Sequence, residues 1–372
     1  MKNMLRQVRH YTGFLAFLCT LLILGAGCNK MADVTTNTRN NAATGTDDIV
    51  SGVGYHPVLL TANKASYGAP HIDPDLLNAW GLSSGPSGIL WVSAADAGLS
   101  YVYNQAGEDV IPPVTIPSHE AGVPGNPTGN IYNPTTDFII PGTGLPSRFI
   151  FASEDGTISA WNGGTSAVIV ADEHKHASYK GLAIANDDGE NFLYVTNFEK
   201  ARIDIFDKNF QQVHGKPFRD DNIPDGYAPF NIRNIDNMLY VTYALRTADG
   251  EEDSTGVGLG FVDVYKPDGH FSKRFATQGK LNAPWGITPT QHVAWRPDYI
   301  LIGNFGDGRI NAFYPDGTFV GQMQNMGQPL EIEGLWAIET QITGVGPKQM
   351  YFTAGPNDEE DGVFGYIEKN PQ

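Results

Sequence analysis

The sequence predicts an all-β fold in which similar units close into a ring, and three observations support this prediction. A segment in which a small residue leads into an apolar run returns six times at roughly fifty-residue spacing. Each copy continues into further short runs with the pattern of β-strands. No stretch keeps the three- and four-residue apolar spacing of a long helix, and 43 Gly and 24 Pro residues favour turns. These features predict a six-bladed β-propeller with four-stranded blades.

The first strand of each blade comes from the recurring segment itself. Its six copies lie at residues 78–82, 126–130, 178–182, 228–232, 283–287 and 334–338. The innermost strands of a propeller line its central channel. The residue directly before the small position therefore enters the channel wall at the same level in every blade.

The second and third strands follow from their composition and alternation. The second runs are rich in β-branched and aromatic residues and end in a small residue, at 90–93, 150–152, 193–196, 239–242, 301–303 and 350–353. The third alternates polar and apolar residues, most clearly at 155–161 and 307–313.

The fourth strands follow tight turns, and the last blade, which lacks a full fourth strand, predicts how the ring closes. Pro-Asp-Gly at 267–269 and 315–317 predicts a turn before an outer strand. The last copy lacks a full outer strand after 364–367, whereas 58–60 is an apolar run without a blade of its own. We expect this N-terminal strand to complete the last blade. A seventh, degenerate blade is the alternative, and the six aligned starts argue against it.

The N-terminal 27 residues have the pattern of a secretory signal. Lys2, Arg6 and Arg9 precede an apolar stretch at 14–27 that is too short to span a bilayer. The segment ends in Leu-Gly-Ala-Gly before Cys28, which resembles the bacterial lipoprotein cleavage motif although Gly stands where that motif prefers Leu. The resemblance implies lipidation of Cys28. An ordinary signal with an incidental cysteine is the alternative.

The expected domain order follows from this signal. Residues 1–27 form the lipoprotein signal peptide, 28–52 a lipidated cysteine and a flexible tether rich in Asn, Thr, Ala, Asp and Gly, and 53–372 the propeller. The protein is then an exported, membrane-anchored lipoprotein of a bacterial cell envelope, on its periplasmic or surface face. Cys19 lies inside the signal, so the mature chain has no disulfide.

The charge balance excludes one class of partner. The chain carries 24 basic and 41 acidic residues, a net charge of −17, and no basic stripe is visible. Nucleic acid requires clusters of Lys and Arg. We therefore expect no nucleic-acid partner.

Several long strings of the sequence resemble a known family. They lie at 149–161, 226–232, 302–310 and 351–358, and the resemblance extends over residues 73–367. The chain resembles exported bacterial proteins of unknown function that are predicted to be propellers. More distantly it is similar to NHL-repeat propellers and to the gluconolactonase and paraoxonase group, which hold a calcium ion in the channel. This family brings no catalytic residues that can be carried over.

One position of the inner strands predicts a ligand-binding collar at the mouth of the channel. The six equivalent residues are four aromatics, one Thr and one Lys: Trp80, Thr128, Lys180, Phe230, Trp285 and Trp336. Aromatic rings around a channel can stack a sugar or another flat ligand. The alternative is that the rings only pack between blades.

Turns after the second strands predict a metal site. The candidate ligands are Glu154, Asn197, Asn304 and Asp307, whose oxygens suit Ca²⁺ if they converge on the channel. Such residues are also common in tight turns, so the alternative is that they only form the turns. The acidic runs at 249–253 and 358–361 are typical of solvated loops, which can also take calcium.

Two functions are candidates at this point, and the sequence favours the first. The first is a lipid-anchored binding module for a glycan, a peptide or an envelope protein, and no acid, base and nucleophile set argues for an enzyme instead. The second is a calcium-dependent hydrolase or lactonase with its metal in the channel. A scaffold in an envelope complex is a third hypothesis, and it predicts an exposed apolar patch.

Overall fold

A computed structural model describes residues 49–50, 54–248, 250, 252–290, 298–345 and 349–370. Within these ranges the only helices are two short 3₁₀ turns, Ala65–Tyr67 and Ala95–Ala97. None of the described helices is long and apolar enough to cross a membrane. The expected signal peptide, Cys28 and most of the expected tether lie outside the described residues.

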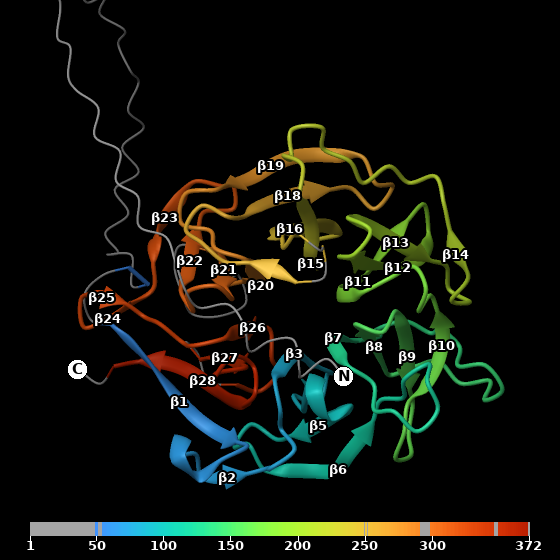
Figure 1. The fold of residues 1–372 in the computed structure, drawn as a ribbon, viewed down its shortest axis with the longest axis horizontal. Helices are drawn as coiled ribbons and strands as arrows, with labels where there is room; N and C mark the ends of the chain where they lie inside the picture. The colour runs from blue at the N-terminus through green and yellow to red at the C-terminus, as the bar shows by residue number, and fades with distance from the viewer. Residues whose placement is uncertain are drawn as a thin grey trace, which may run out of the picture. The chain divides into compact units, whose positions relative to one another are not determined.

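The described strands form six blades around a central channel, as predicted (Figure 1). The first blade contains β3 (Ala79–Ser84), β4 (Leu90–Ala94), β5 (Leu99–Tyr103) and β6 (Asp109–Thr115). The second contains β7 (Pro127–Tyr132), β8 (Phe149–Ser153), β9 (Thr157–Trp161) and β10 (Val168–Asp172). The third contains β11 (Tyr179–Asp187), β12 (Glu190–Asn197), β13 (Arg202–Phe206) and β14 (Gln212–Val213).

The fourth blade has an extra strand. It contains β15 (Tyr227–Ile235), β16 (Met238–Arg246), β18 (Phe261–Tyr265) and β19 (Phe271–Thr277), and the short β17 (Asp253–Ser254) pairs with β16. The fifth blade contains β20 (Pro284–Pro289), β21 (Ile300–Asn304), β22 (Ile310–Phe313) and β23 (Phe319–Gln322). A small hairpin, β24 (Gln324–Asn325) and β25 (Gln328–Pro329), leads to the sixth.

The sixth blade closes the ring in the predicted way. Its first three strands, counted from the channel outward, are β26 (Leu335–Glu339), β27 (Met350–Ala354) and β28 (Val363–Lys369). The N-terminal β1 (Tyr55–Ala62) pairs antiparallel with β28, and β2 (His71–Ile72) lies parallel to β1. Figure 1 shows the blue β1 beside the red β28. The two ends of the propeller are therefore held together by one ladder of backbone hydrogen bonds.

Ile49 and Val50, at the end of the expected tether, lie against the propeller. Ile49 is fully buried in a core cluster that includes Leu301 and Ile310. A Cβ on Gly321 would be 2.6 Å from Val50, which places this side chain directly over β23.

The innermost strands contact their neighbours all the way around the ring, from β3 through β7, β11, β15, β20 and β26 back to β3. This close approach explains the small position of the repeat. A Cβ on Gly81 would be 2.3 Å from the carbonyl oxygen of Thr128, and one on Gly129 would be 2.8 Å from that of Lys180. Only a residue without a side chain fits at these two positions.

The same region of every inner strand is irregular. In all six blades the pairing with the second strand shifts register at or beside the residue before the small position. Such bulges re-aim side chains. Threonines of the second strands bond the backbone there: the Thr196 hydroxyl donates to the Phe230 carbonyl, and the Thr353 hydroxyl to that of Trp80. The small residues that end the second runs therefore support the bulges.

Candidate functional site at the channel entrance

The predicted collar residues meet on the channel axis at the end where the inner strands begin, which we call the entrance. The rings of Trp80 and Trp336 stack with centroids 3.7 Å apart, and Phe305 stacks on Trp336 at 3.9 Å. Trp285 meets Trp336 edge to face at 6.1 Å, and Phe230 does so at 6.0 Å. We call these five residues the aromatic plug.

The plug closes the channel instead of lining it. Trp80, Phe230, Trp285 and Trp336 are each at most 4% exposed. The rings pack against one another across the axis. This arrangement differs from a collar with free ring faces, and also from rings that pack only between neighbouring blades. A ligand approaching the entrance meets very little aromatic surface.

The remaining two collar positions break the aromatic pattern. Thr128 is buried, and its hydroxyl donates to the carbonyls of Ala152 and Tyr179. Lys180 is 2% exposed, and its Nζ lies 5.0 Å from the Trp80 ring and 5.7 Å from that of Phe198. Cation–π attraction holds this ammonium against the aromatic side chains.

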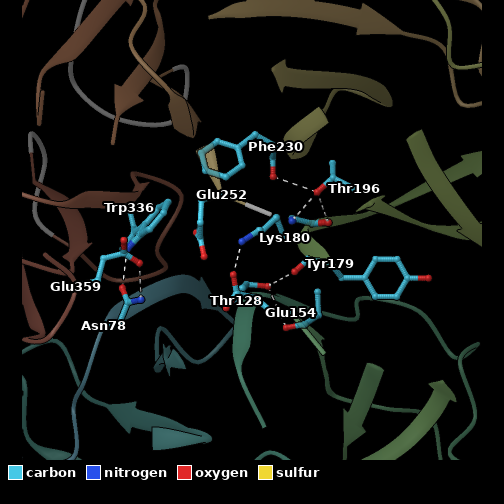
Figure 2. Close-up of polar contacts among 12 residues, drawn as sticks. Asn78, Thr128, Glu154, Tyr179, Lys180, Thr196, Phe230, Glu252, Trp336 and Glu359 are labelled. Carbon is cyan, nitrogen blue, oxygen red and sulfur yellow. Dashed lines mark hydrogen bonds and ion pairs between the residues drawn. The ribbon is translucent and has the colours of Figure 1, made fainter. Parts of the chain in front are cut away.

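Lys180 is surrounded by carboxylates. It forms an ion pair with Glu154, which begins the turn after β8 and is 29% exposed. Figure 2 shows Lys180, Glu154 and Glu252 pointing toward one another. Burial by itself lowers the pKa of Lys180, but the charges of Glu154 and Glu252 more than offset this, so the pKa is raised. Lys180 is therefore charged at neutral pH.

Asp253 is the most unusual carboxylate of this group. Burial, with smaller contributions from Glu252 and Glu154, raises its pKa to about 6, although Lys180 pulls in the opposite direction. Its Oδ2 atom is buried and has no hydrogen-bond partner among the described residues. We call Glu154, Lys180, Glu252 and Asp253 the entrance cluster. Perturbed groups of this kind gather at functional sites.

The fourth blade places two members of the cluster. Its β16 and β18 are joined by a long excursion, in which β17 pairs with the end of β16 through Arg246↔Asp253. The Arg246 Nη1 atom donates to the carbonyl of Glu199 in the third blade. The acidic run at 249–253 was predicted to be a solvated loop. Glu252 is exposed and Asp253 is partly buried, and the charges of both raise the pKa of Lys180. The length of this excursion is the sequence signal that could have identified it.

A fourth carboxylate lies across the plug from Lys180. The Trp336 Nε1 atom donates to Asn78 Oδ1 at 2.8 Å, and the Asn78 Nδ2 atom donates to Glu359 at 2.9 Å (Figure 2). The Nε1 atoms of Trp80 and Trp285, in contrast, are buried without a hydrogen-bond partner in the described structure. The plug therefore holds one satisfied indole and two unsatisfied ones.

The residues predicted to bind calcium have separate partners. Glu154 pairs with Lys180, and Asn197 Nδ2 donates to Asp204 at 2.7 Å. Asn304 and Asp307 lie together, joined by a hydrogen bond of 2.9 Å. Across the described ranges, no group of three or more His, Cys, Asp or Glu side chains is arranged to hold a metal ion. Calcium binding stays a prediction.

The arrangement favours binding of positive charge. Three carboxylates surround one ammonium, and a fourth, Glu359, is bonded to Asn78 on the other side of the plug. An excess of negative charge attracts cations over a distance. The half-exposed Glu154 and the exposed Glu252 make this end reachable from solvent.

Sequence comparison identifies relatives of this chain. Uncharacterized protein R648 of Acanthamoeba polyphaga mimivirus is 33% identical over 330 residues, which cover 84% of this chain and 79% of the viral protein. Uncharacterized protein L690 of the same virus is 34% identical over 320 residues, covering 81% and 83%. The chain belongs to the family of these mimivirus proteins. The predicted membership in an uncharacterised propeller family is thus confirmed, whereas a bacterial origin stays a prediction.

Two further comparisons concern the family models and the solved structures. No family model matches the chain. Among solved structures, a streptogramin B lyase superposes with a TM-score of 0.53 at 14% identity, covering 86% of this chain and 99% of the lyase. At this identity the likeness shows the propeller fold and nothing about activity.

Proposed function

We propose that this propeller is a ligand-binding module of the cell envelope, anchored to a membrane through Cys28, and that its entrance cluster binds a cationic group. The ligand class that suits the cluster best is a peptide with a basic side chain. Glycans and envelope proteins, the other candidates from the sequence, become outcomes of the test.

The excess of carboxylates around Lys180 is the observation that carries this proposal. Lys180 pairs with Glu154, and the buried Oδ2 of Asp253 has no hydrogen-bond partner within the described residues. Leaving a buried acceptor unsatisfied costs about 1–3 kcal/mol. An ammonium or guanidinium group of a ligand that meets the accessible Glu154 and Glu252 would offset the negative charge of the cluster.

The low exposure of the plug argues against a glycan at this end. Sugar recognition by stacking needs the free face of a ring. Trp80 and Trp336 give their faces to each other and to Lys180 or Phe305. Charge, not stacking, is what the entrance offers to a ligand.

A calorimetric titration of the full-length chain tests the entrance site. The probe is a lysine-rich hexapeptide, compared with the same peptide after Nε-acetylation, which removes its charges. We expect the charged peptide to bind with an affinity that falls as salt rises, and the acetylated peptide to bind at least about tenfold more weakly. Equal binding of both peptides, or a preference for a neutral oligosaccharide, would contradict the proposal.

A matched pair of variants locates the binding. Glu252→Gln removes one charge from the cluster and should weaken peptide binding. Glu368→Gln removes the same charge from β28, where Glu368 pairs with His56 on the outer part of the sixth blade. The second variant should bind as the unaltered chain does, and a similar loss in both variants would indicate nonspecific attraction.

The calcium-dependent hydrolase remains the second candidate because of one observation. The unpartnered carboxylate oxygen of Asp253, as the described residues show it, is a hard ligand of the kind that Ca²⁺ prefers. A ligand that binds only the folded state raises the melting temperature by mass action. A rise with calcium that chelator reverses and Asp253→Asn abolishes would favour this candidate, and an unchanged melting temperature would remove it.

The membrane anchor has its own test. Growth of an expressing bacterium with labelled palmitate should label the chain, and Cys28→Ser should abolish the label and release the protein from the membrane fraction. An unlabelled chain, or membrane association that survives Cys28→Ser, would contradict anchoring through this residue.

A further inference from the structure

The third blade has the shortest fourth strand of the propeller, and part of its outer edge is uncovered. In this blade β14 pairs with only two residues of β13, through Ile205↔Val213 and Phe206↔Gln212. In each of the other five blades the fourth strand pairs with at least three residues of the third. Residues 202–204 of β13 therefore have no described strand beside them on the outer side, where Figure 1 shows the short β14.

The backbone of Ile203 faces this open edge. The Asp207 N–H donates to the Gln211 carbonyl across the turn, so Ile205, two residues earlier, also directs its N–H and C=O toward β14. Because these groups alternate in direction along a strand, those of Ile203 point to the same side. The residue opposite Ile203 would be Gly215, whose φ of +99° ends the ladder. Within the described ranges no other backbone group bonds Ile203 on this side.

The segment after β14 is held away from β13 by the fourth blade. The Phe218 N–H donates to the Gly269 carbonyl at 3.0 Å, and the Phe218 ring lies 5.3 Å from that of Tyr265. Asp220, two residues further, forms an ion pair with Arg274 of β19. These contacts keep the segment from closing over β13, so the edge stays open.

A groove of about 350 Å³ lies between β13 and this segment. Ile203, Val213 and Phe218 line it, and all three are partly buried against a core cluster. The groove therefore combines an unpaired strand edge with apolar side chains beside it. An added strand uses both, because its backbone bonds the edge and its side chains pack on the apolar residues.

The charge of the groove lining is mostly positive. Arg202, Lys216 and Arg219 line the groove, and Asp204 is the one carboxylate among the described lining residues. Arg202 is 51% exposed and Arg219 is 78% exposed, in a chain whose net charge is −17. This local excess of cations is complementary to an acidic ligand.

The three cations have carboxylate partners that a ligand can replace. The partners are Asp204 for Arg202, Asp187 for Lys216 and Asp221 for Arg219. The last pair is the most exposed, since the Asp221 side chain is itself 74% exposed. Exposed pairs of this kind are weak. A ligand carboxylate can therefore compete with Asp221 for Arg219.

We propose that this groove binds an extended, acidic peptide segment of a partner protein, which adds to β13 as an edge strand. The peptide backbone pairs with the N–H and C=O of Ile203, and its carboxylates meet Arg202 and Arg219. None of the entrance cluster residues lines the groove. The site is therefore independent of the proposed function, and its ligand has the opposite charge.

Fluorescence anisotropy with a capped heptapeptide that alternates glutamate and valine tests strand addition on the full-length chain. N-methylation of the valines removes the N–H groups along one edge of the peptide strand, and N-methylation of the glutamates removes those along the other. We expect one of these two peptides to bind at least about tenfold more weakly than the parent, and the other to change less than about threefold. Equal losses for both, or no binding of the parent peptide, would overturn the proposal.

A matched pair of variants tests the charge of the groove. Arg219→Glu reverses an exposed charge of the lining and should weaken the acidic peptide about tenfold. Lys208→Glu makes the same reversal in the turn after β13, outside the groove, and should change binding less than about twofold. Similar losses in both variants would show nonspecific attraction and contradict the site.

Two further measurements separate the groove from the entrance and from self-association. Glu252→Gln should leave binding of the acidic peptide unchanged, and a strong effect of this variant would contradict a separate site. Sedimentation of the chain without peptide should show no dimer that the acidic peptide dissociates. Such a dimer would mean that a second copy of the chain occupies the groove, which would overturn the proposed occupant.

Discussion

The two ends of the channel are built on the same six strands and have opposite chemistry. The entrance presents the plug and the entrance cluster. Toward the other end, the exit, the residues two positions further along the inner strands are Leu or Ile in five blades and Asn in the second. We call these six residues the exit ring: Leu82, Asn130, Leu182, Ile232, Ile287 and Ile338. The backbone repeat sets where each side chain points, and the departures from the repeat supply the charge. Lys180 replaces an aromatic residue, and the excursion of the fourth blade brings Glu252 and Asp253 to it.

This difference predicts that substitutions at the entrance change the free energy of unfolding by an amount that depends on pH. Substitutions at the exit should change it by the same amount at every pH. Variants at both ends of the channel, studied at the same pH values, therefore test the contrast.

Lys180→Met should be the most damaging of these changes. It leaves Glu154 and Asp253 without their cation, and removing one partner of a buried ion pair costs about 3–5 kcal/mol. The loss should shrink between pH 8 and pH 5, because Asp253 takes up a proton near pH 6. Urea denaturation at several pH values measures it. Lys208→Met, at an exposed pair with Glu190, should cost less than about 1 kcal/mol.

Ile338→Ala tests the other end of the channel. The side chain is 2% exposed and packs in the exit ring, so its loss should cost about 2–3 kcal/mol, toward the low end for a core truncation because the site already borders a cavity. No titrating group contributes to this packing. The loss should therefore be the same at pH 5 and pH 8, and a strong pH dependence would break the contrast between the two ends.

The two stacked indoles of the plug provide a matched comparison. Trp336→Phe removes a hydrogen bond to Asn78, whereas Trp80→Phe removes an N–H that has no partner in the described structure. Both changes lose similar aromatic area. Trp336→Phe should therefore be the more destabilising by about 1 kcal/mol in thermal or urea unfolding. An equal cost for both would mean that the Asn78 bond contributes nothing.

Asp253→Asn should have the smallest effect and the opposite sign. The pKa of Asp253 rises from 3.8 in the unfolded chain to about 6 in the folded one. The folded state therefore holds the proton more tightly, and the stability from this group is present below pH 4 and lost as the pH rises through 6. At pH 8 the variant should be more stable than the unaltered chain, by on the order of 1 kcal/mol. The difference should vanish near pH 4.

The fold was predictable from the sequence because it depends on patterns that repeat. The copies of the inner strand, their small position and the apolar run at 58–60 together predicted six blades and a ring closed by β1. The level of the plug was also predictable, since Trp80, Phe230, Trp285 and Trp336 align. It could not be predicted that the rings would fill the channel, because the sequence of a single repeat does not determine the distance across the axis.

The site was only partly predictable for a related reason. Lys180 was recognisable as the odd member of an aligned set. Glu252 and Asp253 lie in an excursion that no other blade has, so alignment of the repeats gave no information about where it folds. The Trp285 N–H is orphaned because none of its described neighbours provides a hydrogen-bond acceptor. Such properties follow from contacts between blades, not from the sequence of one blade.

The peptide titration at pH 8 and pH 5 tests the central claim most directly, because it measures whether the charge of the entrance cluster is available to a ligand. We predict that the lysine-rich peptide binds at pH 8, binds more weakly at pH 5 where Asp253 is largely protonated, and loses most of this pH dependence in Asp253→Asn. Binding that is unchanged between the two pH values, or that keeps its full pH dependence in Asp253→Asn, would contradict the account.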